Sequence, residues 1–168
     1  MIRSFLKNII LLFLIILLQV FAFNNIQLGG FINPYFYIIF ILLLPFETPG
    51  WTLLVSSFFL GLFMDMFSQT LGMHASACTL MAFLRPSVLK AFSPRDGYEL
   101  GTLPRIQFYG FTWFLKYALA LIFVHHFVLF YLEMFRFTDF FYTLFRVILS
   151  TLFTGLFVIL SQYFVFRR

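Results

Sequence analysis

Long apolar runs separated by short polar segments make up this chain. Two of these runs, between residues 51 and 92, are separated only by a few residues around Ser68-Gln69-Thr70, which predicts a tight helical hairpin. The pattern over the whole chain predicts six transmembrane helices, since each crossing needs about 20 apolar residues. Their expected bounds are about 4–23, 34–46, 51–67, 72–92, 110–132 and 143–166. The expected fold class is an all-α integral membrane protein with a single polytopic domain over residues 1–168.

Composition strengthens the membrane prediction. Of 168 residues, 62% are hydrophobic and 10% are charged, 29 are Phe, and the mean hydropathy is +1.01. These values lie far outside the range of soluble domains, and they leave no extramembrane domain to carry catalysis. Because Cys78 is the one cysteine, an intramolecular disulfide is excluded.

The positions of Lys and Arg predict how the chain is oriented. Basic residues gather at both ends of the chain and in the segment 85–105, and in a membrane protein such residues mark the cytoplasmic side. They are Arg3, Lys7, Arg85, Lys90, Arg95, Arg105, Arg167 and Arg168. Six helices with both termini cytoplasmic place all three segments on one side. The run 4–23 begins like a signal peptide but lacks a small-residue cleavage site, so we expect a retained first helix.

The second expected helix is unusually short. Asn33-Pro34 has the sequence of a capping residue followed by proline at the first helical position, which predicts a helix start there. From Tyr35 to Phe46 such a helix is about 20 Å long at about 1.5 Å per residue. It therefore has little tilt, lies inside protein, or begins earlier, at Phe31.

Small residues and one acid share a helical face in the central hairpin. Ser57, Gly61 and Asp65 follow one another at i, i+4 and i+8, which places them on one face. Gly72, Ser76 and Thr79 give the returning helix a similar small, weakly polar face. We expect close helix packing around a buried acid, because an ionisable group in an apolar segment is costly. The alternative is that Asp65 simply ends its helix at the membrane interface.

A second polar stripe begins the last helix. Arg146, Ser150 and Thr154 have the same i, i+4, i+8 spacing, and Arg146 enters from the side on which Asp65 lies in the six-helix topology. We therefore hypothesise an ion pair between Asp65 and Arg146, whose disruption would leave a costly unpaired charge.

The histidines offer a weaker chemical signal. His74, His125 and His126 fall toward the outer half of the protein, which raises the possibility of a metal site or a proton relay. Adjacent histidines point about 100° apart on a helix and do not easily bind one ion, so packing roles are favoured. The chain carries no metalloprotease, serine-hydrolase or phosphate-loop motif. We expect no enzyme activity, no cofactor and no metal.

Three motifs together resemble the rod shape-determining protein MreD family. They are I-N-P-Y-F-Y-I-I-F-I-L-L-L-P at residues 32–45, G-L-F-M-D at 61–65 and L-G-M-H-A at 71–75. The length, the start and the basic end also fit, so the likeness covers the whole chain. The last third matches by hydropathy alone.

The resemblance implies a non-enzymatic scaffold of the bacterial cell-elongation machinery in the inner (cytoplasmic) membrane. Proteins of this family work with the periplasmic scaffold MreC, with the actin-like MreB, and with the glycosyltransferase and transpeptidase that extend peptidoglycan. Their fold is similar to that of the substrate-binding membrane subunits of energy-coupling-factor vitamin transporters. The alternative function is thus a solute-binding transporter subunit, with an outward pocket among Asp65, His74, His125, His126 and Arg146.

Overall fold

The computed structural model describes residues 13–23, 33–99, 101–135 and 139–164. Within these ranges every regular element is a helix, which confirms the predicted all-α fold. The first helical stretch described covers residues 13–21. It is followed by the 3-10 helix η2 (Phe36–Ile38), α2 (Ile39–Leu43), α3 (Gly50–Ser68), α4 (Met73–Ala91), α5 (Ile106–Tyr109), α6 (Phe111–Met134) and α7 (Phe140–Phe164).

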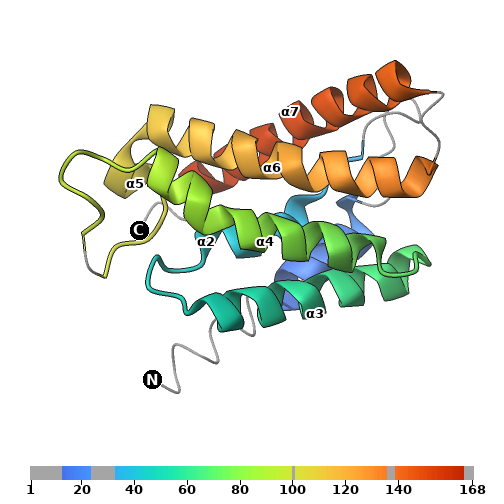
Figure 1. The fold of residues 1–168 in the computed structure, drawn as a ribbon, viewed down its shortest axis with the longest axis horizontal. Helices are drawn as coiled ribbons and strands as arrows, with labels where there is room; N and C mark the ends of the chain where they lie inside the picture. The colour runs from blue at the N-terminus through green and yellow to red at the C-terminus, as the bar shows by residue number, and fades with distance from the viewer. Residues whose placement is uncertain (1–12, 24–32, 100, 136–138, 165–168) are drawn as a thin grey trace.

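The four long helices form one elongated bundle. Helix α3 packs on α4, α4 on α6, and α6 on α7, and the long axis of the bundle follows these helices (Figure 1). Consecutive long helices run in opposite directions, so their connections lie alternately at the two ends of the bundle. The connection from α3 to α4 and the connection from α6 to α7 lie at the same end, which we call the turn end. The segment 44–49 and the loop after α4 lie at the opposite, loop end.

Within the part of the chain that the structure describes, three helices are long and apolar enough to cross a membrane, namely α3, α6 and α7. They support the prediction of a membrane protein. The predicted crossing at 34–46 is wrong in extent, because η2 and α2 together cover only Phe36–Leu43, far less than a bilayer requires. Six crossings and cytoplasmic termini stay predictions.

The short helical segment lies inside protein, as one of the sequence alternatives proposed. Tyr37, Ile38 and Ile39 are completely buried there. The helix does not begin at Asn33-Pro34 as expected, since the cap position is Tyr35 and no side chain caps it. Gln19 holds this start instead: its amide nitrogen donates to the Pro34 carbonyl at 3.0 Å, and its amide oxygen accepts from the Tyr37 N–H at 3.2 Å.

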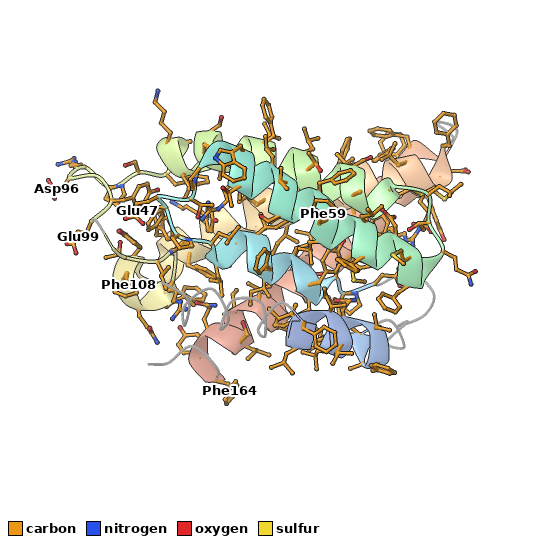
Figure 2. The ribbon with its side chains drawn as sticks, turned by 90° about the horizontal axis from the view of Figure 1, so that it is seen from below. Glu47, Phe59, Asp96, Glu99, Phe108 and Phe164 are labelled. Carbon is orange, nitrogen blue, oxygen red and sulfur yellow. The ribbon has the colours of Figure 1, made fainter. Side chains whose placement is uncertain are left out.

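At the loop end, α4 continues through Pro86 to Ala91, close to the predicted bounds 72–92, so Arg85 lies in this helix although it was also counted with the basic segment 85–105. The loop itself is tied down by aromatic packing, with the rings of Phe46 and Tyr98 stacked at 4.3 Å. The Glu47 carboxylate accepts from the Gly101 N–H at 2.8 Å. Figure 2 shows Glu47, Asp96 and Glu99 together at this end, away from the apolar flank of α3 that carries Phe59.

Candidate functional site

Asp65 caps the N-terminus of α4 from the neighbouring helix. One carboxylate oxygen accepts from the His74 N–H at 3.0 Å and from the Thr70 hydroxyl at 2.5 Å. The other accepts from the Ala75 N–H at 3.0 Å. The first amides of a helix have no intrahelical partner, and the positive end of the helix dipole favours an anion. The expected buried acid is thus present, with Asp65 only 3% exposed, and its partners are two backbone amides and the Thr70 hydroxyl.

Gly61 permits this capping because α3 and α4 touch backbone to backbone. A Cβ atom at Gly61 would lie 2.5 Å from the Ala75 Cα and 2.5 Å from the His74 carbonyl oxygen. Ser57, on the same face, is also fully buried. Gly72 supplies the other requirement, a left-handed turn with φ of 76° immediately before α4. The predicted close packing along Ser57, Gly61 and Asp65 is confirmed.

The predicted second half of that packing is wrong. Ser76 is exposed, and Gly72 and Thr79 are half-buried, so this small-residue face turns away from the α3 seam. It lines an apolar groove of about 720 Å³ on the outer side of the hairpin. We call this the α3–α4 groove; it is lined by Leu54, Phe58, Leu62, Leu71, Gly72, Ala75, Ser76, Thr79, Leu80 and Phe83.

Arg146 does not pair with Asp65, and the hypothesis of that ion pair is wrong. Its guanidinium forms a salt bridge with Glu133 at 3.0 Å and lies over the Phe130 ring, 4.1 Å from the ring centre. Glu133 lies in the last turn of α6 and Arg146 in the second turn of α7, so the ion pair joins these two adjacent helices. The Asp65 carboxylate accepts instead from the Thr70 hydroxyl and from two amides of α4.

Ser150 and Thr154 face the segment before η2 and not the Asp65 stripe. The Ser150 hydroxyl accepts from the Asn33 N–H at 3.3 Å, and the Thr154 hydroxyl accepts from the Tyr35 N–H at 3.1 Å. An extended segment needs such partners, because buried backbone N–H groups without acceptors are costly. The polar stripe of α7 therefore replaces the hydrogen bonds that a helix or strand would have supplied.

Two of the three histidines, His74 and His125, contact the buried hydroxyl of Tyr37. The Tyr37 hydroxyl lies 2.8 Å from His74 Nδ1 and 2.8 Å from His125 Nε2, and it accepts from the Cys78 thiol at 3.8 Å. His126 is satisfied separately, with Nδ1 at 2.8 Å from the Ile122 carbonyl and Nε2 at 3.1 Å from the Thr154 hydroxyl. Among the residues described, no three metal-ligating side chains are placed to hold an ion.

A polar cavity of about 490 Å³ lies at the turn end, above this histidine cluster. We call it the turn-end pocket. It brings His74 of α4 and Arg146 of α7, two of the predicted site residues, to the same cavity. Its lining residues are Phe23, Asn33, Pro34, Tyr35, Ser68, Thr70, Met73, His74, Leu129, Glu133 and Arg146. Asp65, His125 and His126 do not line it.

Arg85 is a buried charge that sequence reasoning assigned to the cytoplasmic loop. It is 2% exposed; its Nε donates to the Tyr117 hydroxyl at 2.9 Å and its guanidinium also donates to the Leu44 carbonyl. Tyr117 in turn donates to the Leu42 carbonyl at 2.9 Å. These carbonyls at the end of α2 have no intrahelical partner, so Arg85 caps that end.

The residues that sequence reasoning missed are Gln19, Tyr37 and Glu133. Gln19 could have been found as the one strongly polar residue in the stretch 9–23. Tyr37 has no such signal in a chain so rich in aromatic residues. No family model, no curated protein and no solved structure matches this chain.

Proposed function

We propose that the chain is a non-enzymatic membrane scaffold of the bacterial cell-elongation machinery, which binds an MreC-like single-pass protein in the inner membrane. Through that partner it would organise peptidoglycan synthesis and maintain rod shape. The proposal begins from the resemblance to the MreD family, carried by motifs around Gly61, Asp65 and Gly72. In the structure these three residues act together: the first allows close packing, the second caps α4, and the third makes the turn.

The observation that carries the proposal is the α3–α4 groove. Transmembrane helices associate through small residues at four-residue spacing, which let two backbones approach. Gly72 and Ser76, and likewise Ala75 and Thr79, have this spacing in the groove. The Ser76 and Thr79 hydroxyls donate to the carbonyls of Gly72 and Ala75 at 2.7 Å each, so both hydroxyl hydrogens are satisfied within α4 and the turn before it. Large apolar side chains from α3 border these small residues.

The proposed orientation places the loop end in the cytoplasm. Lys90 and Arg95 lie at that end, in the last turn of α4 and in the loop after it. At the turn end, the positive charge of Arg146 is matched by Glu133. Basic residues concentrate on the cytoplasmic side of membrane proteins, which favours this orientation and an outward turn end. MreB and the glycosyltransferase and transpeptidase would then be reached through the partner or from the loop end.

The second candidate is a solute-binding membrane subunit of a transporter. The turn-end pocket favours it, because its volume falls in the range of roughly 300–1,000 Å³ that small-molecule sites occupy. In the proposed orientation the pocket opens outward. The scaffold is preferred because the groove offers a partner surface that a solute subunit does not require.

Native mass spectrometry of the detergent-purified protein, coexpressed with a single-pass MreC-like protein, separates the two candidates. We expect a retained partner and no stoichiometric metabolite. Ser76→Leu should fill the groove and release the partner, whereas Ser56→Leu, on α3 outside the groove, should retain it. A stoichiometric metabolite with no retained partner would overturn the scaffold in favour of the transporter subunit.

A further inference from the structure

The turn-end pocket is lined by polar side chains that take no part in the proposed binding of the single-pass partner. It shares no lining residue with the α3–α4 groove. Three of its polar side chains come from separate helices, His74 from α4, Glu133 from α6 and Arg146 from α7, and His74 is 2% exposed. A cavity with a few convergent polar groups at such a helix junction is the usual form of a small-ligand site.

The hydrogen-bond network assigns the proton on His74. Tyr37 has a single hydroxyl hydrogen and lies 2.8 Å from a ring nitrogen of both His74 and His125, so one histidine must donate and the other must accept. The second nitrogen of His125, Nδ1, is buried with no hydrogen-bond partner among the described residues. A buried N–H without an acceptor is the rarer and costlier state, so Nδ1 carries no proton. His125 then donates from Nε2 to Tyr37.

The tautomer of His125 determines which nitrogen of His74 carries a proton. With His125 donating, Tyr37 uses its hydrogen to donate to His74 Nδ1, and the His74 proton must lie on Nε2. Nε2 is the ring nitrogen that this network leaves for the pocket, which His74 lines. The neutral histidine is thereby fixed as a hydrogen-bond donor toward any ligand in the pocket.

Arg146 adds a positive charge to the same pocket. Its guanidinium is held in position by the Phe130 ring and by Glu133, and its side chain is 12% exposed against 42% for Glu133. A guanidinium binds the oxygens of carboxylates and phosphates with fixed geometry. The Glu133 carboxylate contacts both terminal nitrogens of Arg146, at 3.0 and 3.4 Å, as the oxygens of such a ligand would. The Thr70 hydroxyl adds no donor, because its hydrogen is given to Asp65.

We propose that the turn-end pocket binds a ligand through an oxyanion, a phosphate or carboxylate group held between His74 Nε2–H and the Arg146 guanidinium. Because the pocket lies at one end of the apolar helices, the oxyanion can come from an anionic lipid headgroup or from a soluble molecule. In either source the chemistry of recognition is the same. Glu133 competes with the ligand for Arg146 and sets how tightly the oxyanion is held.

The test uses the purified full chain in neutral detergent, with thermal unfolding as the readout. One arm adds inorganic phosphate, with chloride at equal ionic strength as its control. The other arm adds short-chain phosphatidylglycerol, with the matching phosphatidylcholine as its control. We expect a saturable rise in the unfolding midpoint in at least one arm. A response to phosphatidylglycerol alone assigns the site to a lipid headgroup, and a response to phosphate assigns it to soluble oxyanions.

The variants decide whether the response comes from this pocket. Arg146→Gln should weaken binding by at least about tenfold, the loss of one charge-assisted hydrogen bond. Glu133→Gln should tighten binding, because it removes the competing carboxylate, a gain that a merely structural role does not produce. Arg95→Gln, the same change at the loop end, should leave binding unchanged.

No saturable response in either arm, or a response that is equal in the Arg146→Gln and Glu133→Gln variants, would overturn the oxyanion site. Neither result bears on the scaffold, because partner retention is measured separately and depends on Ser76. The Arg146→Gln variant should still retain the single-pass partner, which also serves as the check that it is folded.

Discussion

Replacing Gly61 by alanine tests the packing on which the central hairpin depends. The added Cβ would lie 2.5 Å from the Ala75 Cα, whereas unstrained carbon atoms are about 3.5–4.0 Å apart, so α3 and α4 must separate by about 1–1.5 Å. The contacted atoms are backbone and cannot rotate away. The same shift would stretch the hydrogen bonds that the His74 and Ala75 amides donate to Asp65, now 3.0 Å, beyond hydrogen-bonding distance.

The magnitude follows from those two bonds. Two buried amides left without their acceptor cost about 2–6 kcal/mol, at about 1–3 kcal/mol each. Alanine regains about 1 kcal/mol of helix propensity, which leaves a net loss of about 1–5 kcal/mol. At roughly 2–4 °C per kcal/mol for a chain of this size, the unfolding midpoint should fall by about 2–20 °C.

Two other glycines supply matched controls. A Cβ at Gly50 meets nothing within 4 Å, so Gly50→Ala should be neutral or slightly stabilising. At Gly155 the nearest atom is the flexible Cδ2 of Leu119 at 2.8 Å, so Gly155→Ala should be intermediate. The assay is thermal unfolding in detergent followed by circular dichroism. Equal midpoints for the Gly61 and Gly50 variants would refute the backbone contact between α3 and α4.

Three further predictions follow from the same contacts. Asp65→Ala should destabilise the protein by at least about 2 kcal/mol, since three donors lose their acceptor, and a midpoint equal to that of the parent would contradict the cap. Tyr37→Phe should cost about 1–3 kcal/mol for each histidine nitrogen left unpaired, measured in the same assay; an unchanged midpoint would remove the hydroxyl from the network. In a Cys78→Ala background, Gln69→Cys should react with an impermeant thiol reagent from outside and Arg95→Cys only after the membrane is permeabilised; the reverse pattern would invert the topology.

The local geometry of the hairpin could be predicted because a helix fixes which residues share a face. The spacing of Ser57, Gly61 and Asp65 alone places them together, and an acid among small residues needs burial against protein. The partner of Asp65 could not be predicted in this way, since backbone amides at the start of α4 leave no signal in the sequence. An opposite charge for Asp65 suggested Arg146, whose partner in the structure is Glu133 at the end of α6.

The hydrophobic pattern also failed to predict the short, irregular segment formed by η2 and α2. The run 34–46 is as apolar as a membrane crossing, but η2 and α2 are apolar because most of their side chains are buried in protein. Their end needs the buried Arg85, which by charge alone is typical of a cytoplasmic loop. The apolar pattern reports that a segment is out of water, and it does not distinguish lipid from protein as the surrounding medium.

Site-specific photocrosslinking in living cells tests the scaffold most directly. A photoreactive amino acid would replace Ser76 in the α3–α4 groove and, as the control, Leu152, a residue of α7 that is 54% exposed on an apolar surface. We predict a crosslink from position 76 to a single-pass membrane protein and none from position 152. Equal crosslinking from both positions, or only lipid adducts at position 76, would contradict a partner in the groove and with it the proposed function.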